Sequence, residues 1–384
     1  MTEQKLQELY EYSVQIRRLL HQFPEVGFDL PKTVKIVSDE LRKMGIPCTE
    51  EYGTGSIVGE IGRGEKIVAL RADMDALPVE EKTNLPYCSL HPGCMHACGH
   101  DSHMAVLLAV AKFLKEHENV LPHKVRFIFQ PSEEGAISGA KMMVDQGVME
   151  NVEEVLCTHC DNSLESGVIG VCDGACMAAC IPITISFHGK TSHATEPKSG
   201  VDAIAMAQEA YGKLKNMVVK EAGKADYIWS VGRFCGGHVH NVIADLCEMD
   251  ISFRFFDMDF ADRVMAQVRQ ICDDIANAYG GSVEIDWRMS TGPVNNDSTI
   301  AEKFRKSTKD SRIPLVEIEQ RMTSEDFGWY LTEVPGLLFR FGTRNEATGC
   351  TAPLHRNDFC IDEAGMKSAI AAFIAYINQS EEMR

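Results

Sequence analysis

The first half of the chain alternates short apolar runs with segments whose apolar residues recur at helical spacing. Residues 64–78, 123–135 and 153–162 each contain a run with the length and composition of a buried strand that ends in polar residues. Between them, residues 102–117 and 139–150 show the apolar spacing of helices. Strands and helices that alternate in this way predict an α/β fold with a mostly parallel sheet flanked by helices.

The pattern changes near residue 180. Residues 181–190 and 247–259 alternate apolar and polar side chains, which is typical of half-buried antiparallel strands. Residues 201–217 and 260–278 again have helical spacing. This part of the chain predicts a second, smaller α+β domain.

The first pattern resumes after this region, with a buried strand at 336–342 and a closing helix within 362–379. We therefore expect one domain built from residues 1–179 and 291–384. Residues 180–290 would form the smaller domain, inserted into the first.

Composition narrows the class of protein. The chain has 384 residues, 45% of them hydrophobic, which is enough for a large core. Its formal charge of −18 argues against a nucleic-acid face or a polybasic membrane patch. No run reaches the roughly 18–20 apolar residues of a membrane span, and the charged, helical N-terminus does not resemble a signal peptide. We therefore expect a cytoplasmic protein.

The 14 cysteines are scattered along the chain, so we interpret most of them as buried thiols in a reducing compartment. The CxxC spacing at 157–160 lacks a second CxxC downstream, which disfavours a structural four-thiolate zinc site.

Side chains that bind metals or exchange protons come at the ends of the predicted strands. Asp73 and Asp75 end the first strand, Glu133 and Glu134 the second, and His159 the third. Open α/β sheets bind ligands beyond the carboxyl ends of their strands, so these segments are expected to converge on one site.

A further group precedes the helix predicted at 102–117. His96, Cys98, His100 and His103 lie within eight positions. Thiolate and neutral imidazole are good ligands for zinc and other first-row transition metals, so this density predicts a metal site.

The adjacent glutamates Glu133 and Glu134 supply the complementary chemistry. At the end of a buried strand, one carboxylate needs a cation, and the other can act as a proton acceptor. A metal lowers the pKa of water, and a carboxylate can take the proton and return it to a leaving amine. This combination is sufficient to hydrolyse an amide.

A series of motifs resembles, in order and approximate spacing, the M20 metallopeptidase family. They are RADMDALP, MHACGHDSHMA, FQPSEEG, GKTSHATEPKSGVDAI, NVIADL, TSEDFGWYL and PLHRNDF. Together with IRRLLHQFPEVGF near the start, they are most similar to the amidohydrolase branch, which includes aminoacylases, hippurate hydrolases, auxin-conjugate hydrolases and N-acetyldiaminopimelate deacetylases. The resemblance runs from about residue 15 to 375. It implies a zinc-peptidase-like α/β domain with an inserted ferredoxin-like lid that also forms a dimer.

The resemblance also implies site residues. The implied ligands of two divalent ions, of zinc, manganese, cobalt or nickel, are Cys98, His100, Glu134, His159 and His355. Glu133 would be the general base, and Asp73 and Asp75 would have supporting catalytic roles.

In the lid, His193 resembles the residue that reaches a neighbouring active site and stabilises the oxyanion. Asn241 and Arg254 resemble contacts for the substrate carboxylate. The resemblance therefore implies a homodimer formed through the lid. For Arg254, a solvated surface charge remains an alternative.

The sequence favours a metal-dependent amidohydrolase that cleaves N-acyl amino acids, which are small molecules, into a carboxylic acid and an amino acid. A metallo-dipeptidase of the same fold is the nearest alternative. A cysteine hydrolase with Cys98 as nucleophile would leave Glu133, Glu134 and His355 unexplained. A binding protein on an inactive hydrolase fold is the remaining alternative.

Overall fold

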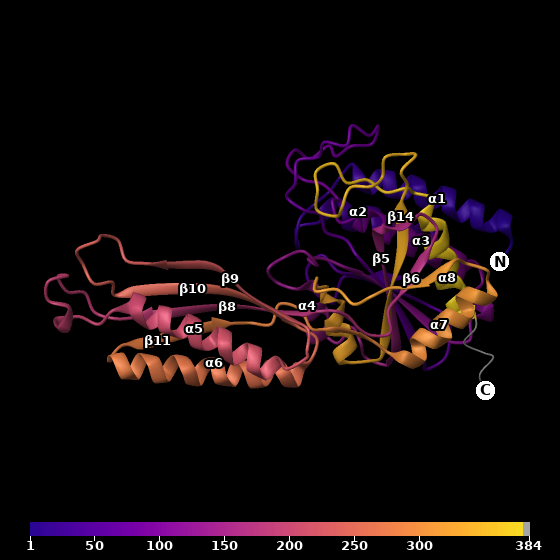
Figure 1. Cartoon of the computed structure of the whole chain (residues 1–384). Coiled ribbons are helices and arrows are strands. Elements are labelled where there is room, and N and C mark those ends of the chain that lie inside the picture. The colour runs from indigo at the N-terminus through magenta and orange to yellow at the C-terminus, as the bar shows by residue number, and fades with distance from the viewer. Residues whose placement is uncertain (379–384) are drawn as a thin grey trace. The chain divides into compact units, whose positions relative to one another are not determined.

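The computed structural model describes residues 1–378, and the chain divides into two compact units (Figure 1). Unit 1 consists of Met1–Cys176, Val294–Gln320 and the chain from Asp326 onward. Unit 2 consists of Met177–Pro293 and the short segment Arg321–Glu325. Within residues 1–378, no helix combines the length and apolarity that crossing a bilayer requires.

Unit 1 is built on an eight-stranded sheet with the order β1-β2-β4-β3-β5-β14-β6-β13. Its strands are β1 (Cys48–Thr49), β2 (Ile57–Ile61), β3 (Ile67–Asp73), β4 (Lys124–Gln130), β5 (Val152–Glu165), β6 (Ile169–Val171), β13 (Leu315–Glu317) and β14 (Gly336–Arg344). The central strands β4, β3, β5 and β14 run parallel, whereas β1, β2 and β6 add antiparallel pairs. A separate small sheet pairs β7 (Gly174–Met177) with β12 (Val294–Asn296). The predicted α/β fold with a mostly parallel sheet is confirmed.

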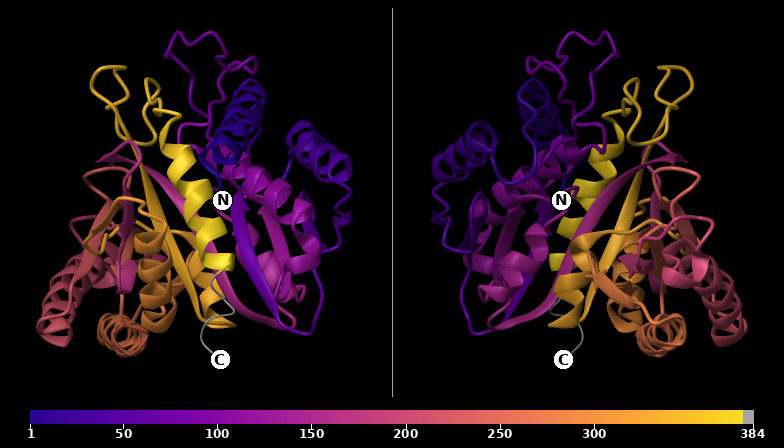
Figure 2. Two further views of the ribbon diagram at one scale, coloured as in Figure 1. Left: turned by 90° about the vertical axis from the view of Figure 1, so that its right-hand side faces the viewer. Right: turned by 90° about the vertical axis from the view of Figure 1, so that its left-hand side faces the viewer.

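Helices cover this sheet. They are α1 (Glu3–His21), α2 (Pro31–Lys43), α3 (His100–Glu116), α4 (Gly139–Asp145), α7 (Ser298–Asp310), α8 (Gly365–Asn378) and the 3₁₀ helices η1 (Glu118–Val120) and η3 (Asp326–Thr332). Helix α3 packs against α1 and α8 (Figure 2), and its side chains are buried almost throughout, as expected for a helix that is apolar on every face. Helix α4 ends at Asp145, earlier than the predicted 139–150. Gly147, with φ of 82°, has a left-handed backbone conformation that terminates the helix.

Unit 2 is a four-stranded antiparallel sheet with the order β11-β8-β10-β9. Its elements are β8 (Ala179–His188), η2 (Pro197–Ser199), α5 (Ala203–Ala222), β9 (Tyr227–Gly236), β10 (Leu246–Phe255), α6 (Met258–Tyr279) and β11 (Ser282–Trp287). Burial alternates along β8 and β10, and the buried residues of α5 and α6 join them in one core. The helix starts are capped by Asp202 and Asp257, whose side chains accept backbone N–H groups. The β-α-β-β-α-β order is that of a ferredoxin-like fold, as expected.

Candidate metal centre

The predicted site residues of unit 1 come from five segments of the chain. Asp73 is the last residue of β3, and Glu133 and Glu134 follow the end of β4. Cys98 and His100 lie at the start of α3. His159 lies inside β5 rather than at its end, because that strand continues to Glu165. The last segment, a turn beyond β14, carries His355.

The turn before α3 depends on a glycine. Gly99 has φ of 81°, in the left-handed region that favours glycine. A Cβ atom at this position would also collide with the sulfur of Cys160. The close approach to β5 therefore requires glycine between Cys98 and His100.

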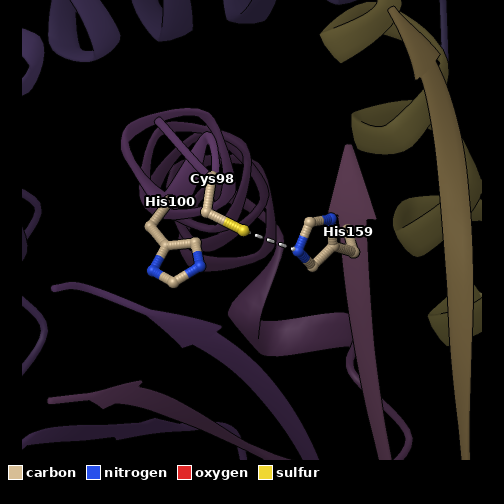
Figure 3. Close-up of side chains that lie close together, drawn as sticks. All are labelled: Cys98, His100 and His159. Atoms are coloured by element: carbon tan, nitrogen blue, oxygen red, sulfur yellow. Dashed lines mark hydrogen bonds between the residues drawn. The ribbon is translucent and has the colours of Figure 1, made fainter. Parts of the chain in front are cut away.

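The five predicted ligands lie together. The Cys98 sulfur is 3.4 Å from Nε2 of His159 (Figure 3) and 3.3 Å from Nε2 of His355. Nε2 of His355 is 3.0 Å from Oε1 of Glu134. Two groups, Cys98–His100–His159 and Cys98–Glu134–His355, have their ligand atoms within 4.8 Å of one another and share the thiol.

His159 is held in the form that binds a metal. Its Nδ1 lies 2.7 Å from the backbone oxygen of Cys160, so Nδ1 carries the proton and Nε2 presents a lone pair toward Cys98. Burial, aided by neighbouring positive groups, lowers the pKa of His159 well below its ordinary value. The ring is therefore neutral.

His100 is fully buried, yet within residues 1–378 neither of its ring nitrogens has a hydrogen-bond partner. Nδ1 lies 3.6 Å from Asp75 and 3.8 Å from Asp73, and Nε2 lies 3.8 Å from Glu133. Burial alone would lower the pKa of His100, but the surrounding carboxylates raise it to about 10. A buried imidazole among carboxylates, without a partner, marks a place that a cation would stabilise.

The thiol of Cys98 has the same electrostatic environment. Burial and then the charges of Glu134 and Glu133 raise its pKa well above the ordinary value. A bound cation would offset these charges and favour the thiolate, so metal binding would release a proton. Thiolate, imidazole and carboxylate donors together fit a divalent transition metal.

Asp75 positions the two glutamates. Its buried carboxylate accepts the backbone N–H groups of Glu133 at 2.9 Å and Glu134 at 3.1 Å. The preceding Ser132 has a φ of 51°, so the turn has an uncommon backbone conformation that these bonds stabilise. Asp75 thus acts on the site through the backbone of the neighbouring turn.

Asp73 and His103 form a satisfied pair. Nδ1 of His103 is 2.6 Å from Asp73, and its Nε2 accepts the backbone N–H of Cys160 at 2.9 Å. Burial would raise the pKa of Asp73, but nearby imidazoles and Arg71 lower it well below its ordinary value. Because both nitrogens of His103 are engaged, His103 supports the site and is not available as a ligand, whereas the nitrogens of His100 are.

A buried network behind Asp73 was not recognised from the sequence. The Arg71 guanidinium contacts Asp73 at 2.7 Å and Asp326 at 2.9 Å, and its Nε donates to Gln130 at 2.8 Å. Ser138 also donates to Asp326, at 2.7 Å. Asp326 belongs to the TSEDFGWYL motif, and this motif was the sequence feature that could have identified it as a site residue.

A second network, also missed, supports the start of α3. Asp101, next to His100, accepts Nε of Arg17 at 3.0 Å and lies 2.8 Å from Nδ1 of His21. Arg17 also donates to Glu363 at 2.9 Å. Arg17 and His21 both lie in the opening motif IRRLLHQFPEVGF.

The turn that carries His355 is held at both ends. His355 has φ of 67°, rare for a residue with a side chain, and its N–H donates to the backbone oxygen of Ala97 at 2.8 Å. The buried Asn162 amide donates to the oxygens of Ala352 at 2.8 Å and Cys360 at 2.9 Å. Asn162 is a further positioning residue that the sequence analysis did not identify.

The three predicted substrate contacts lie in unit 2. His193 pairs with Val242 in an isolated bridge, and Ala194 N–H donates to the oxygen of Asn241, so His193 and Asn241 are neighbours on the surface of that unit. Arg254 instead donates to Met322 oxygen and Ser324 hydroxyl, each at 3.0 Å.

Comparison with known proteins agrees with this α/β fold and with a metal site. Residues 69–379 match the model of peptidase family M20/M25/M40. The chain is 36% identical over 370 residues to Thermostable carboxypeptidase 1 of Saccharolobus solfataricus, covering 94% of this chain and 93% of that protein. It is 32% identical over 367 residues to N-acetyl-L-cysteine deacetylase of Bacillus subtilis, covering 95% of this chain and 87% of the relative.

Among solved structures, the Bacillus subtilis YXEP protein, described as a dinuclear metal binding peptidase of the M20 family, has a TM-score of 0.84 and 31% identity. The match covers 97% of this chain and 98% of that one. Fold and site define a metal-dependent hydrolase that acts on amide bonds. The chain belongs to peptidase family M20/M25/M40, and the predicted resemblance is confirmed.

Proposed function

We propose that the protein hydrolyses the amide bond of N-acyl amino acids to give a carboxylic acid and a free amino acid. The observation that carries this proposal is the convergence of the ligands Cys98, His100, Glu134, His159 and His355, with Glu133 beside His100. The deacetylase relative supports an acyl group as the part removed.

These five side chains would hold two divalent ions of zinc, manganese, cobalt or nickel. Two ligand groups that share Cys98 support two ions, as does the dinuclear description of the YXEP protein. When bound, the ions would polarise the substrate carbonyl and lower the pKa of water.

Glu133 would move the proton. Its backbone is fixed by Asp75, and its carboxylate lies 3.8 Å from Nε2 of His100, at the edge of the ligand group. From there it would accept a proton from the attacking water and transfer it to the leaving nitrogen. Asp73 and Asp75 would support this step by holding His103 and the glutamate turn.

In unit 2, His193 would stabilise the developing oxyanion, and Asn241 and Arg254 would bind the substrate carboxylate. One Arg254 nitrogen donates to Met322 and Ser324, which would orient the guanidinium.

We also propose a homodimer formed through unit 2. Its sheet ends in β9, which has no fully buried residue, and exposed Ile228 and Phe234 lie on that edge strand. Edge strands of this kind can pair with another chain. Analytical ultracentrifugation should give the mass of a dimer for the wild type. Phe234→Glu places a charge on the edge strand of unit 2 and should give the mass of a monomer.

A dipeptidase is the second candidate. The relative that is 36% identical to this chain is described as a carboxypeptidase, which is an enzyme that cleaves peptide bonds. The deciding experiment combines elemental analysis of the purified protein with assays of N-acetyl amino acids, N-benzoyl amino acids and dipeptides, each with and without a chelator. We expect about two metal ions per chain and chelator-sensitive turnover of the N-acyl compounds. Turnover of free-amine dipeptides alone would favour the second candidate, and full activity of the metal-free protein would contradict both.

A further inference from the structure

The turn that carries His355 is flanked by two cysteines whose role is unassigned. The sulfur of Cys360 lies 3.0 Å from the sulfur of Cys350, closer than ordinary non-bonded contact, and both thiols are reduced. Formation of a disulfide requires the two atoms to approach to about 2.05 Å, so the sulfurs are already close to bonding distance.

The backbone holds the two cysteines in this arrangement. Cys350 pairs with Asn345 in an isolated antiparallel bridge at one end of the turn. At the other end, the Asn162 amide donates to the backbone oxygens of both Ala352 and Cys360. Because a single buried side chain ties both limbs together, the closeness of the sulfurs results from the fold around the turn.

Solvent can reach one member of this pair. Cys360 is partly exposed, whereas Cys350 is buried between exposed residues of the chain, 346–349 on one side and Thr351 on the other. The buried Cys172 and Cys176 are also near each other in the chain, but both are buried below the surface. The pair at the His355 turn is therefore the better placed of the two to meet a reagent.

We propose that Cys350 and Cys360 form a reversible disulfide by exchange with a low-molecular-weight disulfide such as oxidised glutathione, which closes the turn that carries His355. Cys360 donates its S–H to Cys350, and this hydrogen bond lowers the pKa of Cys350 to about 7. This hydrogen bond favours the thiolate of Cys350, whereas the partly exposed Cys360 is the thiol that a reagent reaches more readily, so either sulfur can begin the exchange.

The exchange balances in two steps. One thiolate of the pair attacks one sulfur of the reagent, a mixed disulfide forms, and one reagent thiolate leaves. The other cysteine of the pair then loses its proton and attacks the protein sulfur of the mixed disulfide, which forms the protein disulfide and releases the second reagent thiolate. Two protein thiols are oxidised by two electrons, and the reagent disulfide is reduced to two thiols that take up the protons.

Trypsin makes the test direct, because Arg344, Arg356 and Lys367 divide the region into peptides 345–356 and 357–367. Each peptide contains a single cysteine, Cys350 in the first and Cys360 in the second. The full chain is equilibrated with oxidised glutathione, free thiols are alkylated, and the unreduced tryptic digest is analysed by mass spectrometry.

We expect the two peptides to appear as one linked species that separates on reduction. Cys360→Ser and Cys350→Ser should each lose the linked species and retain glutathione on the remaining cysteine at most. Cys235→Ser, which removes an exposed cysteine of unit 2, should keep it. Alkylated, unlinked peptides from the oxidised wild type would overturn the proposal, as would separate glutathione adducts or a cross-link to another cysteine.

Discussion

Two buried groups of polar side chains meet at the start of α3, and they differ in how their charges are balanced. Around Asp101, the carboxylate faces Arg17 and His21, and Arg17 also reaches Glu363. Around His100, several carboxylates, a thiol and imidazoles come together, and the His100 ring nitrogens have no hydrogen-bond partner within residues 1–378. In the first group the charge of Asp101 is offset by Arg17 and His21, although its Oδ1 has no hydrogen-bond partner among the described residues. In the second group a bound cation would offset the excess of carboxylates around His100.

Hydrogen-bond partners distinguish a candidate ligand from a supporting residue at the start of α3, where both kinds occur. His100 and His103 are three positions apart, and both are buried. His103 is satisfied at both nitrogens by Asp73 and Cys160, so it stabilises the site. In this pair the residue type is the same, and the hydrogen-bond partners differ.

The largest effect is expected from Glu133→Gln, which keeps the size of the side chain and removes its proton affinity. Turnover of an N-acyl amino acid should fall by about 10²–10⁴-fold, because the general base is lost. Metal content should stay at the wild-type level, as measured by elemental analysis of the same preparation. Turnover equal to that of wild type would exclude Glu133 as the base.

In the Asp101 group, Arg17→Met should lower the free energy of unfolding by about 3–5 kcal/mol, because it removes the guanidinium from the fully buried Asp101 and leaves only His21 beside that carboxylate. Arg18→Met is the matched control: Arg18 binds the same Glu363 but its side chain is 49% exposed, so a loss of only about 0–1 kcal/mol is expected. Urea unfolding of both variants with chelator present measures the difference. Equal losses would mean that the ion pairs of this group are not what stabilises it.

The pH dependence of stability provides a smaller test of the same group. Burial would raise the pKa of Glu81, but its bonds to His21 and to Ser89 N–H lower it to about 2. The contribution of Glu81 is therefore fully present above its unfolded pKa of about 4.3 and is lost as the pH falls through about 2. We expect wild type to exceed Glu81→Gln by about 3 kcal/mol near neutrality, and the gap to shrink in acid. A gap that is constant from neutral pH into acid would contradict this assignment.

The sequence predicted the elements, and the convergence of the five candidate ligands, better than it predicted the supporting residues. Buried strands and the helix that starts at His100 have strong local patterns, and the ligands are concentrated in short motifs. Arg71, Asp326 and Asn162 act across distant segments, and nothing in their local sequence indicates which backbone or side chain they meet. His159 shows the same limit, because β5 continues past it to Glu165 and no local pattern marks that extension.

The smallest expected effect is the stabilisation by a bound metal ion, which should distinguish the His100 group from the Asp101 group. A divalent ion at about 100 times its dissociation constant should stabilise the wild type by about 2.7 kcal/mol, because it binds the folded state. Arg17→Met should gain the same increment, since its defect lies in the Asp101 group and leaves the candidate ligands unchanged. His100→Ala should gain little, because it lacks a ligand. Thermal unfolding of the three proteins with metal and with chelator gives the increments, and an equal increment in His100→Ala would place the ion elsewhere.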